Sequence, residues 1–527
     1  MVVVANVKHL ANRIARLHVE LQINNVRTRT LAQSKSVHCY KLNGYNIVID
    51  IASGSVHNVD DVAFDAISLY KRFDDKNELV SLLIETHPDI DKNEVLALFD
   101  DIELLVSRGK LFSPDNFASV FDRNNQADAT SAGDRLLPLQ NDSVPLKALC
   151  LNVAHACNMV CNYCFADYAT NGGNIGHGTI PCHGQNSDDD AGQNITPRLM
   201  NLDVGKRAID YLLEHSDNIK TLDVDFFGGE PLLNWDIVKA IVLYARELEQ
   251  NSDKKFRFTL TTNGLLIDDD VISFCNTHMY NVVLSLDGRP EVHDAMRKLH
   301  NGGGSYAEVL PKFKKLVDAR HGKGYYIRGT YTNKNLDFLS DILHIADLGF
   351  REISLEPVVS SPNSALDLSA DNLLILFDQY EALAIEMLRR ETGDNGFSFY
   401  HFTIDLTGGP CIHKRLAGCG VAGSYLAVTP SGELYPCHQF VGNDNFIMGD
   451  VWKGVTNTKL QDEFSSCSIY SRDECRDCWA RFYCSGGCVA NAYYTDGSIN
   501  GIYELGCEIF KKRIECAIMM RVARTGA

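Results

Sequence analysis

The chain has 527 residues, 45% of them hydrophobic, and a formal net charge of -18 at pH 7. This length suits about three domains of ordinary size, and the acidic balance argues against a general nucleic-acid binder, which needs a basic surface. No window of the sequence approaches the roughly eighteen continuous apolar residues of a membrane span. We therefore expect neither nucleic acid nor membrane among the partners.

The first folded unit is expected at residues 37–115, after an N-terminal extension at residues 1–36. Three short strands are predicted in it, at residues 38–42, 45–51 and 55–58. Asn43-Gly44 separates the first two strands, and an Asn-Gly pair is the strongest short hairpin signal because both residues tolerate a positive φ angle. The unit therefore begins with a small antiparallel sheet.

Three helices are predicted after these strands. Asp60 and Asp61 can cap the first helix, the others are expected at residues 78–84 and 93–108, and Gly109 ends the last one. This order of elements predicts a winged-helix-like unit. Its helices carry many acidic side chains, which repel phosphate, so DNA binding is disfavoured. A purely structural subdomain remains the alternative to a binding role.

A polar linker is expected at residues 116–145, and an apolar strand follows at residues 149–153. A C-x3-C-x2-C loop comes directly after that strand and contains Cys157, Cys161 and Cys164. Three thiolates can hold three irons of a 4Fe-4S cluster, which leaves the fourth iron open to bind a small molecule and to pass it an electron. The spacing therefore predicts chemistry at a metal.

A zinc knuckle is the alternative for this loop, and it needs a fourth ligand nearby. The local candidates are His155, Cys182 and His183. His155 is too close to Cys157 for the usual spacing. The other two lie in an apparent insertion at residues 169–197, rich in Gly, Asn and Asp, where His177 also lies. That composition predicts a flexible loop.

Strands and helices then alternate along the chain. An apolar strand ends at residues 228–231 in Gly-Gly-Glu-Pro, and further strands are predicted at residues 256–262, 282–286, 326–328 and 352–355, each leading to a polar tip. Helical periodicity separates them, for example at residues 236–248 and 306–319. Parallel strands in such a series place their ligand-binding residues at their carboxyl ends. The fold class is therefore α/β.

A second cysteine-rich region begins after residue 410. Cys419 is followed by Gly432 and Cys437, and then come Cys475, Cys478, Cys484, Cys488 and Cys507, with Cys411 just before the series. Two zinc ribbons are the alternative here, because paired C-x2-C motifs are also a zinc pattern. The remaining cysteines need no disulfide framework, and they are Cys39, Cys150, Cys182, Cys275, Cys467 and Cys516. A thiol-rich chain belongs in a reducing compartment, so a cytoplasmic location is expected.

Five motifs that follow one another over residues 145–360 resemble those of the radical S-adenosylmethionine (SAM) enzymes. They are the cysteine loop, Gly-Gly-Glu-Pro, Thr262-Asn263-Gly264, the segment 285–288 and Arg297. The resemblance implies a partial (β/α)6 barrel at residues 146–375 and a cluster on the three cysteines whose open iron chelates SAM. It also implies that SAM contacts come from Tyr163, Gly228, Gly229, Glu230, Pro231, Thr262, Asn263, Ser285, Asp287, Arg297 and Arg328. Arg297 is expected on the SAM carboxylate, because a guanidinium grips a carboxylate with two hydrogen bonds.

The second cysteine series resembles the SPASM extension of radical SAM enzymes that modify peptides. The resemblance implies a SPASM domain at residues 411–516, joined to the core by a helical region at 376–410 and followed by a tail at 517–527. It implies two auxiliary 4Fe-4S clusters, and hence three clusters in all. Cys419, Cys437 and Cys488 are expected on one of them, with Cys411 as an open question, and Cys475, Cys478, Cys484 and Cys507 on the other.

The N-terminal unit resembles the leader-peptide recognition domain of peptide-modifying enzymes, in which an exposed strand pairs with the leader. Together with residues 149–155 and 409–440, residues 41–50 resemble the maturases of SCIFF peptides, and the likeness covers about residues 37–516. The implied function is an oxidoreductase of RiPP maturation that forms thioether crosslinks in a ribosomally made cysteine-rich precursor peptide. A flavodoxin- or ferredoxin-type protein is the implied low-potential electron donor. The alternatives are an anaerobic sulfatase-maturating (formylglycine-forming) enzyme and a non-catalytic iron-sulfur redox protein.

Overall fold

The structure is a computed structural model that describes residues 36–118, 144–164, 199–359, 364–404, 406 and 412–525. Within this part of the chain the strands form a three-stranded sheet, an eleven-stranded sheet and a two-stranded ribbon. No helix among the described residues is long and apolar enough to cross a membrane. The predicted N-terminal extension, most of the linker, the insertion at 169–197 and Cys411 lie outside the described residues.

The N-terminal unit contains the three strands and three helices predicted from the sequence. Its antiparallel sheet has the order β1-β2-β3, with bounds β1 (Val37–Leu42), β2 (Tyr45–Asp50) and β3 (Val56–Val59). Asn43 and Gly44 both have positive φ angles, which confirms the hairpin. The helices are α2 (Asp61–Leu69), α3 (Lys76–Thr86) and α4 (Lys92–Ser107). Aspartate side chains cap all three, since each accepts hydrogen bonds from first-turn amides.

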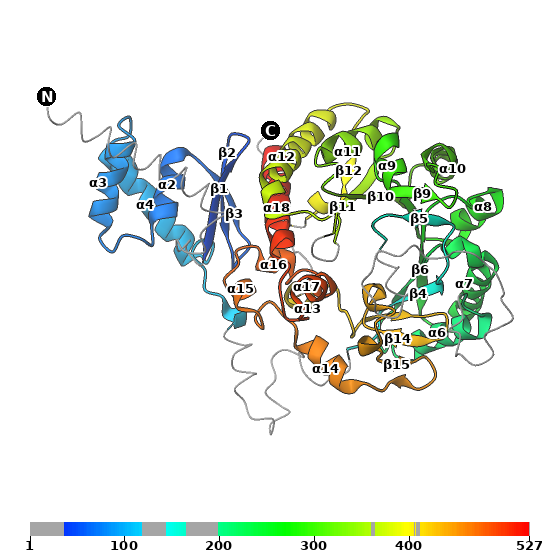
Figure 1. The fold of residues 1–527 in the computed structure, drawn as a ribbon. Coiled ribbons are helices and arrows are strands. Elements are labelled where there is room, and N and C mark those ends of the chain that lie inside the picture. Colours follow the sequence, from blue (N-terminus) through cyan, green and yellow to red (C-terminus); the bar gives the residue numbers. More distant parts are fainter. Residues whose placement is uncertain are drawn as a thin grey trace, which may run out of the picture.

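The large sheet contains six parallel strands that are neighbours in chain order. They are β4 (Ala148–Ala154), β6 (Thr221–Gly228), β7 (Lys255–Thr262), β8 (Asn281–Ser285), β10 (Tyr325–Tyr331) and β11 (Glu352–Pro357). A helix follows each strand, namely α6 (Leu202–Glu214), α7 (Trp235–Gln250), α8 (Asp269–His278), α10 (Tyr306–Ala319), α11 (Phe338–Asp347) and α12 (Leu373–Arg390). The predicted strand and helix alternation is therefore confirmed (Figure 1).

Side chains alternate between the two faces of this sheet. On β7, Phe256, Phe258 and Leu260 are buried in the main core, whereas the intervening Arg257 and Thr259 are only partly buried. The helices cover the apolar face, as Figure 1 shows for α7 and α8. The opposite face is polar, which is the arrangement expected where a parallel sheet binds ligands rather than packing on a second layer. Strand β10 runs to Tyr331, beyond the end predicted at residue 328, so Gly329 and Thr330 lie within the strand.

The eleven-stranded sheet extends beyond the six core strands. At one edge β12 (Ser398–Phe399) pairs with β11, and at the other β13 (Tyr425–Val428) pairs in parallel with β4. Antiparallel strands β14 (Glu433–Tyr435), β15 (Gly449–Asp450) and β16 (Gly454–Val455) complete that edge. The cysteine-rich region is therefore built directly onto the core sheet, which the sequence did not indicate.

The remaining helices lie mostly after residue 400. They are α9 (Pro290–Met296), α13 (Ile412–Ala417), α14 (Thr458–Ser466), α15 (Asp473–Arg476), α16 (Arg481–Cys484), α17 (Val489–Asp496) and α18 (Glu504–Thr525). Short 3-10 turns are η2 (Pro231–Asn234), η3 (Ala370–Asn372), η4 (Tyr400–Phe402), η5 (His438–Phe440) and η6 (Asp444–Phe446). Helices α12 and α18 run across the domain boundaries expected at 375/376 and 516/517.

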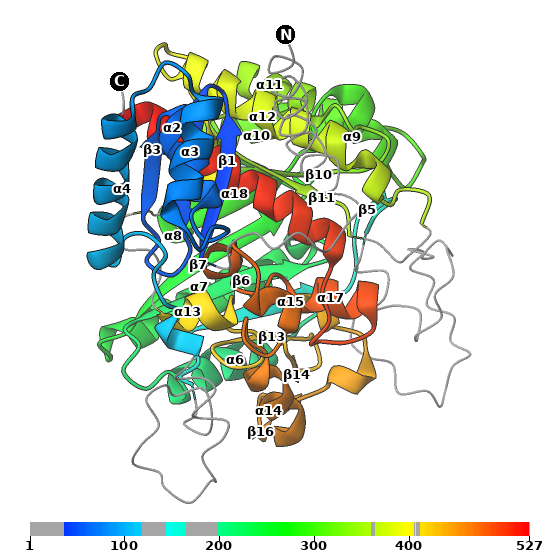
Figure 2. The same cartoon turned by 90° about the vertical axis from the view of Figure 1, so that its left-hand side faces the viewer.

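Helix α18 joins the parts of the molecule. It packs along α12 and against β1 of the N-terminal unit, and Figure 2 shows it crossing behind the N-terminal sheet. The Tyr40 hydroxyl donates to the Glu515 carbonyl at 2.9 Å, and His38 Nε2 lies 3.0 Å from Glu515 Oε1. The His38 ring also stacks on Trp479, with 3.9 Å between ring centroids. The N-terminal unit is thus docked on the rest of the chain through specific polar and aromatic contacts.

Candidate active site

The C-x3-C-x2-C loop lies at the carboxyl end of β4, as the motif order predicted. Its middle forms β5 (Met159–Cys161), which pairs antiparallel with β9 (Arg297–Leu299), so that Cys161 is the register partner of Arg297. The Asn162 amide donates to the Met296 carbonyl at 2.9 Å. This ribbon fixes the loop against the segment after β8, which places two motifs that are far apart in sequence side by side.

The three thiols of the loop influence one another electrostatically. Burial raises the pKa of Cys157, and the charges of Glu230, Cys161 and Cys164 raise it further, while the Met159 amide opposes them. Such thiols favour the protonated form until a cation replaces the protons. The loop therefore gathers three soft sulfur donors that a positively charged centre would deprotonate.

Gly228 and Gly229 allow the end of β6 to lie directly on this loop. Gly228 has a φ angle of +126°, and a Cβ atom there would lie 2.3 Å from the Ala154 carbonyl oxygen. A Cβ atom on Gly229 would lie 2.2 Å from the Ala156 carbonyl oxygen and 3.2 Å from Cys157 Cβ. Only glycine fits such a close backbone approach. The Gly-Gly pair thus allows the end of β6 to pack against the backbone that leads into the cysteine loop.

Glu230 is fully buried and uses both carboxylate oxygens within the protein. Oε1 accepts from Thr262 Oγ1 at 2.8 Å and from the Leu232 amide at 3.0 Å, and Oε2 accepts from the Asn263 amide at 2.8 Å. Burial raises the pKa of Glu230 to about 7, although these three hydrogen bonds oppose the shift. The carboxylate therefore connects the carboxyl ends of β6 and β7, and Pro231 begins the 3-10 turn η2 beside it.

Asn263 reaches from the end of β7 to the cysteine loop. Its Nδ2 donates to Asn158 Oδ1 at 2.7 Å and lies 3.7 Å from Cys157 Sγ. Its Oδ1 accepts from the Leu265 amide at 3.1 Å. Thr262 and Asn263 therefore lie with Glu230 at the base of the loop, and the structure brings these three predicted site residues together.

Asp287, Arg297 and Tyr163 form a second group beside the loop. Arg297 Nε donates to Asp287 Oδ2 at 3.1 Å, the Tyr163 hydroxyl donates to the same oxygen, and the Thr330 amide donates to Asp287 Oδ1 at 3.0 Å. The guanidinium also lies over the Tyr163 ring, 5.5 Å from its centroid. Arg297 therefore already has a buried carboxylate partner, which the sequence did not reveal.

Ser285 and Arg328 lie in register on neighbouring strands β8 and β10. Ser285 is partly buried at the carboxyl end of β8, and Arg328 is exposed on the polar face of the sheet. Both are thus near the carboxyl edge that bears the cysteine loop. His155, which precedes the loop, has a buried Nε2 atom without a hydrogen-bond partner in the described part of the chain.

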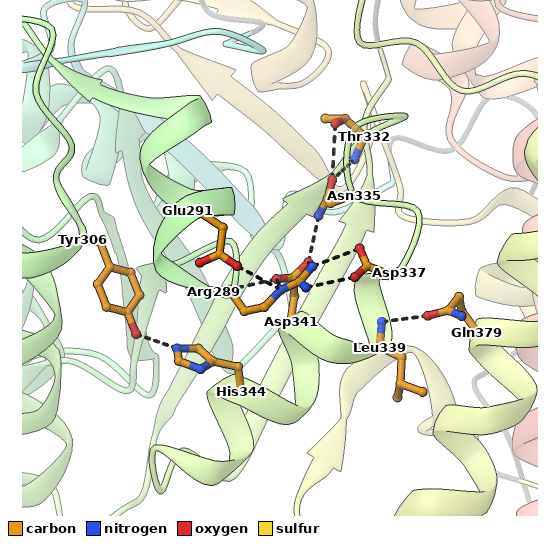
Figure 3. Close-up of polar contacts among 10 residues, drawn as sticks. All are labelled: Arg289, Glu291, Tyr306, Thr332, Asn335, Asp337, Leu339, Asp341, His344 and Gln379. Carbon is orange, nitrogen blue, oxygen red and sulfur yellow. Dashed lines mark hydrogen bonds and ion pairs between the residues drawn. The ribbon is translucent and has the colours of Figure 1, made fainter.

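A network missed by the sequence supports the turn after β8. Asp341 is fully buried, and Oδ1 accepts from the Arg289 amide at 3.0 Å and from Arg289 Nε at 2.8 Å, while Oδ2 accepts from Asn335 Nδ2 at 3.0 Å (Figure 3). Gly288 has a φ angle of +138°, and a Cβ atom there would lie 2.4 Å from Asp341 Oδ1. Asp341 thus holds the turn that carries Asp287.

Comparison with known proteins identifies this architecture. The model of the Radical SAM superfamily matches residues 151–336. This part of the chain is a radical SAM domain. Its bounds include the cysteine loop, the Gly-Gly-Glu-Pro turn and the Arg297 strand.

Relatives with a radical SAM domain extend the likeness beyond these bounds. The radical SAM cyclopropyl synthase TigE of Paramaledivibacter caminithermalis is 22% identical over 391 residues, which cover 69% of this chain and 72% of that protein. The cysteine-type anaerobic sulfatase-maturating enzyme of Clostridium novyi is 23% identical over 301 residues, covering 55% and 79%. Among solved structures, anSMEcpe with bound AdoMet has a TM-score of 0.58 at 20% identity, covering 73% of this chain and 96% of that chain. That structural likeness shows the fold.

The donor chemistry of the radical SAM domain fits an iron-sulfur cluster. Among the described residues no group of three or more His, Cys, Asp or Glu could hold a single metal ion. A cubane cluster makes a different demand, because each thiolate binds its own iron and the sulfurs need not converge on one point. Three interacting thiols on a loop held by β9 and by the Gly-Gly turn meet that demand.

Outside the radical SAM domain, the structure gathers the later cysteines into two groups. Burial raises the pKa of Cys437, and the charges of Cys488 and Cys419 add to the shift. Burial likewise raises the pKa of Cys484, and Cys507, Cys478 and Cys475 add to it. The two groups have the same membership as the ligand sets implied by the resemblance. Cys411 lies outside the described residues, as do His177, Cys182 and His183.

Arg472 is a further residue beside the second group that sequence spacing did not reveal. Its side chain is buried, and Nη2 donates to the Ile499 carbonyl at 2.8 Å. Burial raises the pKa of Cys475, and the charge of Arg472 opposes this rise. A buried cation thus accompanies four thiols. Of the cysteines left outside these groups, Cys150, Cys275, Cys467 and Cys516 are buried and Cys39 is partly buried.

Proposed function

We propose that this chain is an oxidoreductase that forms thioether crosslinks, Cys sulfur to carbon, in a ribosomally made cysteine-rich precursor peptide. The observation that carries the proposal is the presence of three separate cysteine groups, one in the radical SAM domain and two after it. A redox carrier that merely shuttles electrons has no need for the SAM-type loop and its Gly-Gly-Glu-Pro support.

In this proposal Cys157, Cys161 and Cys164 hold the first 4Fe-4S cluster. The two later groups hold the auxiliary clusters, one on Cys419, Cys437 and Cys488 and the other on Cys475, Cys478, Cys484 and Cys507. A cluster bound there would supply the electron that cleaves SAM to a radical able to remove a hydrogen atom from substrate. The protein's part is to hold the thiolates in place, and to keep Asp287, Arg297 and Tyr163 packed beside them through buried hydrogen bonds.

The electron balance gives the auxiliary groups a use. Joining a thiol to a C–H carbon forms one S–C bond and removes one hydrogen atom from carbon, one proton from sulfur and one further electron. The hydrogen atom leaves as 5'-deoxyadenosine, the proton goes to solvent, and the electron needs an acceptor. Clusters that differ in burial and hydrogen bonding have different potentials. A flavodoxin- or ferredoxin-type donor in a reducing cytoplasm would supply the electrons that SAM cleavage consumes.

The N-terminal unit is proposed to bind the leader of the precursor peptide. In the order β1-β2-β3, strand β2 is central, and β3 is an edge strand whose residues are partly or fully exposed. The other edge strand, β1, contacts α18. An exposed edge can add a peptide strand through backbone hydrogen bonds, so β3 is the better candidate. This assignment supports a winged-helix-like recognition domain over a purely structural one.

A formylglycine-forming activity is the second candidate, and the sulfatase-maturating relatives favour it. Its product differs chemically, since a substrate Cys or Ser becomes an aldehyde. The N-terminal strand and helix unit at residues 37–115 weighs against it, because enzymes of that type resemble this chain without such a unit.

Mass spectrometry decides between these activities. Anaerobically reconstituted protein, SAM and reductant are incubated with a cysteine-rich peptide encoded beside the gene. The proposal predicts a product that is lighter by two hydrogens for each crosslink. For each crosslink the peptide should also have one fewer thiol that reacts with an alkylating reagent. An aldehyde in place of a thiol would favour the sulfatase-type activity, and intact SAM would reject both. A leader-truncated peptide should react far more slowly, and equal reaction rates would reject the role of the N-terminal unit.

A further inference from the structure

Arg472 is a buried cation in the cysteine-rich region, and its guanidinium is only partly satisfied. The residue is 4% exposed and directly precedes the short helix α15, which carries Cys475. Its Nη1 donates to the Gly486 carbonyl, and its Nη2 donates to the Ile499 carbonyl at 2.8 Å. Its Nε is buried and has no hydrogen-bond partner in the described part of the chain. Arg472 therefore keeps one donor that no described residue satisfies.

The two carbonyl contacts join segments that carry different cysteines. Gly486 follows Cys484, and Ile499 precedes the helix α18, which carries Cys507. The approach at Gly486 is close, because a Cβ atom there would lie 3.2 Å from Nη1 of the arginine. The guanidinium of Arg472 thus holds together the backbone segments that bring these cysteines into one group.

Within the described residues no carboxylate forms an ion pair with Arg472. The buried Arg481, by contrast, pairs with Asp115 at 2.9 Å. An uncompensated charge inside a protein is costly, and the groups that interact with Arg472 are thiols. Burial raises the pKa of Cys475 and of Cys467, whereas the charge of Arg472 and a hydrogen bond with it oppose the rise in both. Sulfur is therefore the counter-charge that the fold offers to this guanidinium.

The other auxiliary group has no such cation. Burial raises the pKa of Cys437 and of Cys488, but no described Arg or Lys opposes the rise there.

A cluster gains one negative charge when it takes up one electron, and its net charge and the hydrogen bonds to its sulfurs set its potential. We propose that Arg472 is a positioning residue whose charge makes the cluster of Cys475, Cys478, Cys484 and Cys507 the more easily reduced of the two auxiliary clusters. That cluster then holds the electron released when sulfur joins carbon, while the thiol proton goes to solvent and the carbon hydrogen leaves with 5'-deoxyadenosine. The assignment rests on the proposed function.

The test is a redox titration followed by electron paramagnetic resonance on the anaerobically reconstituted full chain. Cys157, Cys161 and Cys164 are replaced by Ala in every sample, so that only the auxiliary potentials are measured. Arg472→Gln should make reduction of one auxiliary cluster about tenfold less favourable, which lowers a one-electron potential by about 59 mV. The other potential should not move. Arg521→Gln removes the same charge at an exposed position of α18 and should change neither potential. The proposal is rejected if Arg472→Gln moves neither potential or moves both equally.

Arg472→Lys separates the charge from the carbonyl contacts. Lysine keeps the positive charge but lacks the planar fork that bonds two carbonyls, so the potential should stay close to that of the protein with Arg472. A purely structural role predicts that the Lys variant behaves like the Gln variant, and that result rejects the proposal.

If Arg472→Gln loses the iron of this group, Arg472→Lys decides the question. Full iron content with an unchanged potential supports the role of the charge, and loss of iron from the Lys variant rejects it. The proposed function fails in a different way. Equal iron content in wild type and in a variant with Cys475, Cys478, Cys484 and Cys507 replaced by Ala would show that these cysteines hold no cluster.

Discussion

At the scale of single residues, the site depends on close packing around the cysteine loop. Gly229, Glu230 and Asn263 each touch this loop or its support, and the contacts involve backbone atoms that cannot move far. Asp287 likewise accepts three hydrogen bonds although it is fully buried. The loop is thus held in one conformation before any ligand binds, which lowers the entropic cost of binding.

Gly229→Ala should destabilise the loop and reduce its retention of iron. The new methyl group would lie 2.2 Å from the Ala156 carbonyl oxygen, so the backbone must shift, at a cost of about 1–3 kcal/mol. Iron content per chain and the thermal midpoint of the anaerobic protein measure the effect. Gly393→Ala is the control, because a Cβ atom there meets nothing within 4 Å. Equal iron retention in both variants would contradict the packing role of Gly229.

His293 should make the protein less stable at acid pH. The side chain is fully buried, and burial lowers its pKa from 6.5 to about 4. Between these values the unfolded chain binds a proton that the folded chain does not, so stability falls as pH decreases from about 6.5 towards 4. The loss should reach roughly 1–3 kcal/mol.

Guanidinium unfolding between pH 7.5 and about pH 5 measures this dependence. His293→Asn should flatten the curve relative to wild type. His321→Asn serves as the control because His321 is exposed with a φ angle of +53°, which Asn tolerates. An unchanged pH dependence in His293→Asn would show that another group is responsible.

At the scale of elements, long-range contacts join the N-terminal unit to the cysteine-rich region. Asp115 follows α4, and its Oδ2 accepts from Arg481 Nη2 at 2.9 Å, while the Tyr470 hydroxyl donates to Oδ1 at 2.9 Å. Arg481 is 5% exposed and lies on α16 between Cys478 and Cys484. An ion pair between the buried Arg481 and the partly buried Asp115 therefore connects the proposed leader-binding unit to the group of Cys475, Cys478, Cys484 and Cys507.

Asp115→Ala should weaken this connection strongly. It leaves Arg481 buried without its carboxylate, and breaking a buried pair from one side costs about 3–5 kcal/mol. Hydrogen exchange of the segment 468–484 should become faster, and the thermal midpoint should fall. Asp253→Ala, at an exposed position, is the control. Unchanged exchange in the segment would mean that the ion pair contributes little.

The sequence predicted the elements better than their long-range partners. The core helices and strands follow from local periodicity, which predicts α10 at Tyr306–Ala319. The Asn43-Gly44 pair likewise predicts the N-terminal hairpin. The pairing of β13 with β4 could not be predicted, because strand partners are set by packing and not by local pattern. For the same reason the sequence suggested Arg297 as a ligand residue but gave no sign of its Asp287 partner, nor of Asp341 below the turn.

At the scale of the whole molecule, α18 contacts three separate parts of the chain. It carries Cys507 near its start, Arg513 beside Glu356 in the middle, and Glu515 against β1 of the N-terminal unit. A single helix therefore connects the cysteine group of Cys475, Cys478, Cys484 and Cys507, the carboxylate of Glu356 on the core sheet, and the proposed leader-binding sheet. In the proposed function, a leader bound to the N-terminal sheet is in this way held in fixed relation to the cysteine groups.

The most direct test of the account is the formation of 5'-deoxyadenosine from SAM by anaerobically reconstituted, reduced protein. The account predicts that wild-type protein and the control Cys39→Ala form it, while a variant with Cys157, Cys161 and Cys164 all replaced by Ala retains the later iron but forms none. Zinc in place of iron in oxygen-free preparations, uncut SAM under strong reduction, or equal cleavage by the triple variant would contradict the central claim.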